Sequence, residues 1–103
     1  MTYLDANATE PLRPSAAEAM IEAACIVGNP SSIHTAGRAA RALLENARET
    51  IAHALGADPL NCIFTSGGTE ANALALHALG AGRRFLVGRT EHDAVRQSVP
   101  TQA

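Results

Sequence analysis

The sequence predicts an α/β fold in which helices pack on a mainly parallel sheet. A long amphipathic pattern covers residues 36–55, and two short apolar runs follow it at 62–65 and 84–87. A helical segment separates these two runs, and two strands joined by a helical crossover form a parallel pair. At 103 residues the chain has the length of one domain.

The first helix is predicted over about residues 14–26. Pro14 suits the first turn of a helix, because the N–H that proline lacks would be unpaired there. Ser15 and Glu18 have the spacing of a capping box. Gly28 ends the helix, and a loop follows.

The clearest periodic segment predicts an amphipathic helix of about five turns. Small and apolar residues recur at spacings of three and four from Ala36 to Leu55, with charged residues on the other face. Thr35 is the expected N-cap, and Gly56 is suited to the left-handed conformation that follows a helix. The loop residue His34 has no assigned role.

Two strands with a helix between them are predicted in the remaining third of the chain. The run at 62–65 is apolar and bounded by turn residues, as is typical of a buried strand. The helix at 69–79 is closed by Gly80, and its apolar residues occupy most sides, so we expect burial on more than one side. A second strand is expected at 84–87, and 90–99 is weakly helical.

Composition excludes several classes of protein. The net charge of −2 with mixed signs lacks the basic footprint of a nucleic-acid-binding protein. No apolar run approaches the roughly 20 residues that span a bilayer, and the first residues lack the pattern of a signal peptide. Cys25 and Cys62 lie far apart without metal-ligand spacing. We therefore expect reduced core thiols in a cytoplasmic protein and no metal site.

The segment 63–72 has the order strand, glycine turn, helix start. Free N–H groups at a helix N-terminus and the helix dipole favour an anion by roughly 0.3–2 kcal/mol. Gly67 and Gly68 allow close backbone approach, and the hydroxyls of Ser66 and Thr69 can add donors. The spacing matches neither a P-loop nor a dinucleotide fingerprint. We predict a phosphate site here, and the alternative is a plain strand-to-helix connection.

His92 follows the second predicted strand. Ligands gather at the carboxyl ends of parallel strands, so His92 should lie beside the turn at Gly67 and Gly68. An imidazole at that place can stack on a ring or move a proton near neutral pH. The alternative is a solvated loop histidine.

Five stretches together resemble the cysteine desulfurases, which are members of the class V aminotransferase family. They occur in the family's order and spacing, and they are YLDANAT at 3–9, GNPSSIH at 28–34, GADP at 56–59, FTSGGTEAN at 64–72 and TEHDAV at 90–95. The resemblance implies the N-terminal part of a fold type I enzyme dependent on pyridoxal 5′-phosphate, with a partial, mainly parallel sheet. It divides this single partial domain into an N-terminal arm over about 1–30 and the start of the cofactor-binding α/β domain over about 31–103.

The resemblance also implies an activity and its residues. Such an enzyme takes sulfur from L-cysteine, leaving L-alanine and an enzyme-bound persulfide for iron–sulfur cluster or thiolation pathways. A sulfur-acceptor protein and a homodimer are the implied partners. Gly68 and Thr69 would bind the cofactor phosphate. His92 would stack over the pyridine ring as a cofactor-binding residue and would assist proton transfer as a catalytic one.

The lysine that this cofactor chemistry requires is not present in the sequence. All eight basic residues are arginine, whereas the aldehyde of the cofactor must be held by a lysine. The family places that lysine and the persulfide cysteine further along, and neither Cys25 nor Cys62 matches the latter. We therefore expect the chain alone to be inactive, as a gene fragment, a truncated chain or half of a split gene completed by a C-terminal chain.

Two alternatives to a desulfurase fragment stay open. One is a fragment of a selenocysteine lyase or another class V aminotransferase, although the stretch GNPSSIH favours a desulfurase. The other is a stand-alone module that binds phosphate ligands.

Overall fold

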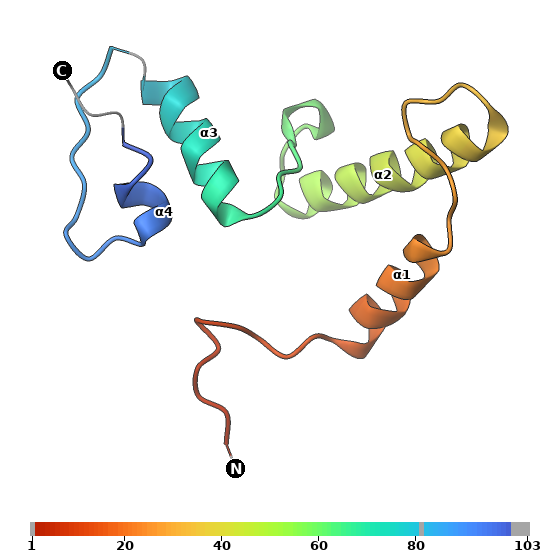
Figure 1. Ribbon diagram of the computed structural model, residues 1–103, viewed down its shortest axis with the longest axis horizontal. Coiled ribbons are helices and arrows are strands. Elements are labelled where there is room, and N and C mark those ends of the chain that lie inside the picture. Colours follow the sequence, from red (N-terminus) through yellow and green to blue (C-terminus); the bar gives the residue numbers. More distant parts are fainter. Residues whose placement is uncertain (1, 81, 100–103) are drawn as a thin grey trace. The chain divides into compact units, whose positions relative to one another are not determined.

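The computed structural model describes residues 2–80 and 82–99, and the chain forms two compact units, Met1–Cys62 and Ile63–Ala103. Figure 1 shows the helical elements in chain order. They are α1 (Pro14–Ala24), α2 (Thr35–Ala54), the 3-10 helix η1 (Pro59–Asn61), α3 (Gly68–Gly80) and α4 (Asp93–Arg96).

Helix α1 confirms the first predicted helix but begins without a side-chain cap. Its N-cap residue is Arg13, which makes no capping hydrogen bond, and Pro14 opens the first turn. The predicted capping box of Ser15 and Glu18 is therefore wrong. Because Pro14 already occupies the first turn, Ser15 lies inside the helix and cannot precede it.

Helix α2 has the predicted extent and a different cap. The Nδ1 atom of His34 accepts a hydrogen bond from the Gly37 N–H at 3.3 Å, so His34 is the N-cap and the prediction of Thr35 is wrong. Beyond the helix, Gly56 has a φ of 65°, which confirms the expected left-handed residue. The imidazole of His34 thus has a structural role that the spacing of apolar residues does not reveal.

The loop between α1 and α2 folds back closely on the first turn of α2. A Cβ atom added to Gly28 would lie 2.3 Å from the Ala36 carbonyl oxygen, and one added to Gly37 would lie 2.4 Å from the Ser32 carbonyl oxygen. Within the loop, the Asn29 side chain accepts from the Ser31 N–H at 2.9 Å. The two glycines are required because backbone meets backbone at these points.

The 3-10 helix η1 packs against α2 in the same unit. The carboxylate of Asp58 caps η1 by accepting from the Leu60 N–H at 2.9 Å. Arg48 of α2 donates from Nη1 to the Cys62 carbonyl oxygen, and its Nε lies 3.0 Å from Glu45. These bonds tie the end of the first unit to the side of α2.

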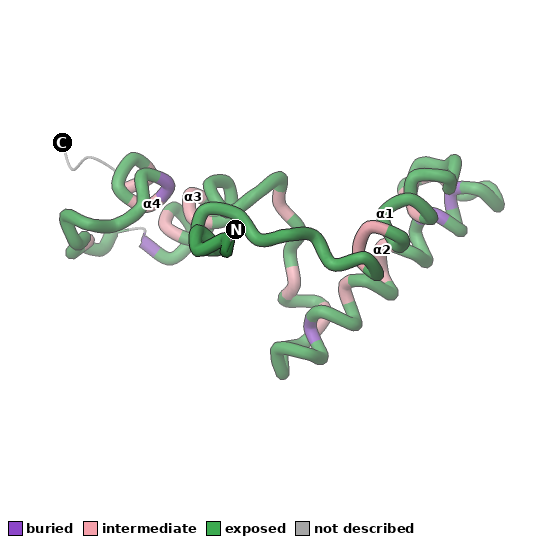
Figure 2. Tube along the Cα trace, turned by 90° about the horizontal axis from the view of Figure 1, so that it is seen from below, coloured by how far each residue is buried: buried purple, intermediate pink, exposed green. Residues whose placement is uncertain are grey.

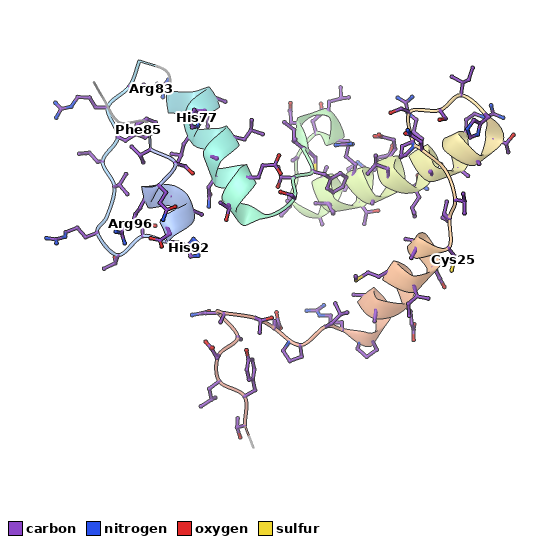
Figure 3. All side chains as sticks on the ribbon, in the orientation of Figure 1. Cys25, His77, Arg83, Phe85, His92 and Arg96 are labelled. Atoms are coloured by element: carbon purple, nitrogen blue, oxygen red, sulfur yellow. The ribbon has the colours of Figure 1, made fainter. Side chains whose placement is uncertain are left out.

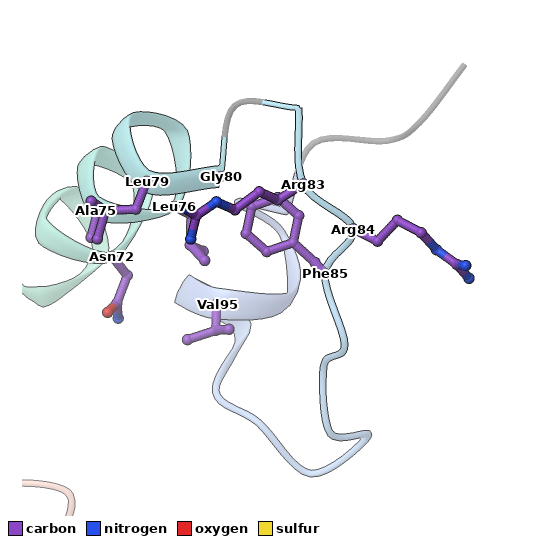
Figure 4. Close-up of a pocket in the computed structure, with 9 residues that line it drawn as sticks. All are labelled: Asn72, Ala75, Leu76, Leu79, Gly80, Arg83, Arg84, Phe85 and Val95. Carbon is purple, nitrogen blue, oxygen red and sulfur yellow. The ribbon is translucent and has the colours of Figure 1, made fainter.

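In the second unit, α3 and α4 contact each other. The segment between them turns at Gly82, which has a φ of 70°. A Cβ atom on Gly80 would lie 1.8 Å from the Phe85 ring, so this ring covers the end of α3. The C-terminal half of α3, Phe85 and Val95 surround a hollow of about 350 Å³ (Figure 4).

The two predicted strands are not present in the structure. Among residues 2–80 and 82–99 no residue belongs to a β-strand, and 62–65 and 84–87 are irregular backbone. Cys62 has extended angles, with φ −93° and ψ 115°, but without a ladder. An apolar run favours extended backbone, whereas a strand needs a hydrogen-bonded neighbour, and an isolated pair of strands is marginal in water. The predicted sheet is therefore not confirmed.

Burial is much lower than the apolar pattern of the helices predicts. Figure 2 shows that most of the described chain is exposed, and its buried apolar residues are Ala40, Ala52 and Ala94. Within α3, Leu74 is 46% exposed and Leu79 is 72% exposed, so the expectation that this helix is buried on several sides is wrong. A helix buries an apolar face only against a second layer, and without one that face stays in water.

Replacing Gly37 with alanine should loosen the loop at 28–34. Alanine gains about 1 kcal/mol of helix propensity over glycine, but overpacking against the Ser32 carbonyl costs typically about 1–3 kcal/mol. We expect faster amide hydrogen exchange across the loop in Gly37→Ala, measured by mass spectrometry. Gly67→Ala is the matched control, since an added Cβ there meets nothing within 4 Å. Unchanged exchange in Gly37→Ala would contradict the close backbone approach.

Candidate functional site

The turn that leads into α3 presents a set of unpaired backbone donors. The first bond of the helix runs from the Ala71 N–H to the Gly67 carbonyl oxygen at 3.1 Å. In the described part of the chain, the N–H groups of Gly68, Thr69 and Glu70 make no hydrogen bond. These are the first-turn groups that a helix cannot satisfy internally. The site therefore has the donors that an anion requires.

Gly67 and Gly68 leave space above these donors. A Cβ atom built on either residue meets nothing within 4 Å, and neither has a positive φ. The chain's own packing and backbone conformation thus do not require glycine at these positions. The two residues instead leave the amides open to the close approach of a ligand.

The two predicted hydroxyl donors differ in their availability. The Ser66 hydroxyl donates to Oε2 of Glu70 at 2.6 Å, so its hydrogen is already used. Across residues 2–80 and 82–99, the Thr69 hydroxyl has no hydrogen-bond partner. Thr65 supports the turn by donating from its hydroxyl to the Gly67 carbonyl oxygen at 3.1 Å. Of the two predicted hydroxyls, that of Thr69 is thus the one left for a ligand.

A carboxylate lies beside the unpaired amides. Oε2 of Glu70 accepts from the Ser66 N–H at 2.6 Å as well as from the Ser66 hydroxyl. Both bonds lower the pKa of Glu70 from its ordinary value of 4.5, and the bond from the Ser66 hydroxyl has the larger effect. The turn therefore carries a negative charge at neutral pH, a feature that the prediction of a phosphate site did not include.

His92, which is labelled in Figure 3, is the N-cap of α4. Its Nδ1 atom accepts from the Ala94 N–H at 3.0 Å, and the residue is exposed. An accepting Nδ1 in a neutral imidazole assigns the hydrogen to Nε2. His92 and the α3 turn belong to the same unit, and the stacking of His92 on a cofactor ring stays a prediction.

The other cysteine and histidine side chains of the described residues have separate environments. Cys25 is a free, exposed thiol at the end of α1, so the expectation of a core thiol is wrong for it, and Cys62 is free and half-buried. The Nδ1 atom of His77 lies 2.8 Å from the Ala73 carbonyl oxygen.

In the portion that the structure describes, no group of three or more His, Cys, Asp or Glu residues is placed to hold a metal ion. No helix of that portion is long and apolar enough to cross a membrane.

Comparisons with known proteins agree with the sequence motifs. The pattern of the aminotransferase class-V family matches residues 2–102. The chain is 46% identical over 96% of its length to the IscS-like cysteine desulfurase of Mycobacterium tuberculosis and 46% identical over 90% to the cysteine desulfurase IscS of Dictyoglomus turgidum. It is 38% identical over 91% of its length to the selenocysteine lyase of Homo sapiens. It covers 27%, 25% and 26% of these proteins, so it spans about a quarter of the length of the curated relatives.

The Glu70 carboxyl should titrate below 4.5, because the bonds from Ser66 favour its ionised form. The stabilisation of the turn is then fully present above the ordinary pKa of the carboxyl and is lost as the pH falls through the lowered pKa. A ¹³C NMR titration of the carboxyl, with the Ser66 amide as a second probe, measures this midpoint. Ser66→Ala removes the larger contribution and should move the midpoint upward. A wild-type midpoint at or above 4.5 would contradict the contact.

Proposed function

This chain belongs to the class V aminotransferase family, and we propose that it forms the N-terminal part of a cysteine desulfurase dependent on pyridoxal 5′-phosphate. Membership implies the fold type I of that family. Two of the relatives above are named cysteine desulfurases. The stretch GNPSSIH, which forms the tight loop before α2, supports the desulfurase reaction over others of the family.

The observation that carries the proposal is the unpaired donor set at the start of α3. Gly68 and Thr69, the positions that the family resemblance implies for the cofactor phosphate, have unpaired N–H groups, and Thr69 adds an unpaired hydroxyl. Amide and hydroxyl donors at a helix N-terminus suit a phosphate dianion. These residues therefore fit the phosphate of the cofactor, which when bound supplies the electron sink for breaking a bond to sulfur.

His92 is the proposed partner of the cofactor ring. Its Nδ1 accepts from the Ala94 N–H, so Nε2 is the ring nitrogen that remains for a ligand. A cap of this kind fixes the orientation of the imidazole and the position of its hydrogen. We propose that His92 stacks on the pyridine ring and moves a proton through Nε2.

The proposed reaction transfers one sulfur atom from L-cysteine to a thiol of the enzyme. The carbon–sulfur bond breaks, a sulfur–sulfur bond forms, and the carbon gains the hydrogen of the attacking thiol, which yields L-alanine and a persulfide. The thiol and the lysine that holds the cofactor aldehyde are proposed to lie in the remainder of the enzyme. We also propose that this remainder pairs with 62–65 and 84–87 as strands of the sheet.

The oligomeric state, the location and the sulfur acceptor of the enzyme are proposed from the family resemblance. We propose a homodimer in the cytoplasm that passes its persulfide sulfur to an acceptor protein for iron–sulfur clusters or thiolation. The second candidate reaction is that of a selenocysteine lyase, which the identity to the human protein of that name supports. The third candidate is a phosphate-ligand binding module, which the unpaired amides of α3 support without any catalytic step.

Thr69→Val should weaken the binding of pyridoxal phosphate by about tenfold, because a hydrogen bond to a charged group contributes about 1.5 kcal/mol or more. A ³¹P NMR titration of the ligand with the chain measures its affinity. Thr50→Val is the control, since the Thr50 hydroxyl donates within α2 to the Asn46 carbonyl oxygen. Equal affinity of Thr69→Val and Thr50→Val would contradict a phosphate contact at Thr69.

The chain alone should not turn over L-cysteine when pyridoxal phosphate is added. A sequence without lysine has no side-chain amine that could hold the cofactor aldehyde. We expect sulfide and alanine only at the rate of free cofactor, and the same absorbance spectrum as a mixture of cofactor and L-cysteine without the chain. Turnover above that rate would show that these 103 residues suffice for the reaction.

A further inference from the structure

The carboxylate of Glu70 bridges the turn that carries the unpaired amides. One oxygen, Oε2, accepts both the N–H and the hydroxyl of Ser66, each at 2.6 Å. Glu70 is the third residue of α3, and Ser66 lies two residues before the helix begins. In a capping box the side chain of the third helical residue reaches back to the N–H of the cap residue. Here it reaches one residue further, and so it spans Gly67 and Gly68.

Few other contacts restrain the residues of the turn between Ser66 and Glu70. Ser66 through Glu70 are exposed, and two adjacent glycines have large backbone freedom. The Thr65 hydroxyl and the Ala71 N–H each donate to the Gly67 carbonyl oxygen at 3.1 Å. Without the bridge, the amides of Gly68 and Thr69 would point in a range of directions, and only a fraction of the chains would be ready to bind an anion.

We propose that Glu70 is a positioning residue for the phosphate site, and that it acts by orienting the amides of Gly68 and Thr69 through its two bonds to Ser66. This inference rests on the proposed function. Orienting the amides favours phosphate binding, whereas the charge of Glu70 opposes it. Substitutions that remove one of these effects and keep the other can therefore separate them.

The experiment compares Glu70→Gln with Glu70→Ala in the 103-residue chain. Glutamine keeps one oxygen that can accept both Ser66 bonds, and it removes the charge. Alanine removes both the bonds and the charge. Glu49→Ala is the control, because Glu49 is an exposed glutamate of α2 in the other unit. The two measurements are amide hydrogen exchange at Ser66–Glu70 without ligand, and the affinity for pyridoxal phosphate by ³¹P NMR.

Glu70→Gln should keep the slow exchange of the Ser66 amide and bind pyridoxal phosphate at least as tightly as the wild type. Glu70→Ala should exchange faster at Ser66 and bind about threefold to tenfold more weakly, as expected for the loss of a helix-capping side chain. Equal exchange in Glu70→Ala and the wild type would overturn the proposal, as would weak binding by Glu70→Gln. If the wild type shows slow Ser66 exchange but no binding, the phosphate site is wrong and Glu70 positions nothing for it.

Discussion

The way in which each helix satisfies its first N–H groups organises this chain. His34, Asp58 and His92 each place a side-chain acceptor before α2, η1 and α4, respectively. In α1 a proline at the first position removes one donor instead. Helix α3 differs, because no side chain accepts from the N–H groups of its first turn, and Glu70 instead accepts from the amide of Ser66, which precedes the helix. An unsatisfied first turn is a cost to a helix unless water or a ligand binds it, and this contrast distinguishes the candidate site from the other helix starts.

Apolar surface is the second constraint on the structure. The buried apolar side chains of the described residues are alanines, whereas Leu60, Leu79 and Leu86 are 89%, 72% and 97% exposed. Parallel strands are stable when helices cover both faces of their sheet and further strands flank them. The two apolar segments 62–65 and 84–87 have neither in this structure, and they are accordingly irregular. The chain spans about a quarter of the length of its curated relatives.

Local features were predictable where they depend on neighbours in sequence. The periodicity from Ala36 to Leu55 gives the extent of α2, and the glycines at 56 and 80 mark the ends of α2 and α3. The glycine turn with its unpaired amides at the start of α3 was predictable from the glycine pair, whereas phosphate binding there stays a prediction. Histidine caps were missed, since an imidazole is not among the preferred N-cap residues. The contact of Glu70 with Ser66 carries a signal in their spacing of four residues, which resembles a capping box lengthened by one.

The sequence by itself determined the helices, the family and the candidate residues Gly68, Thr69 and His92, because these depend on local spacing and on motifs in a fixed order. The tertiary structure decided which donors are available. It showed that the Ser66 hydroxyl is bound by Glu70 and that His92 uses Nδ1 to cap α4, because hydrogen bonds depend on side-chain geometry. It also decided the fate of the predicted sheet, since a strand exists only when another segment supplies the donors and acceptors of its ladder.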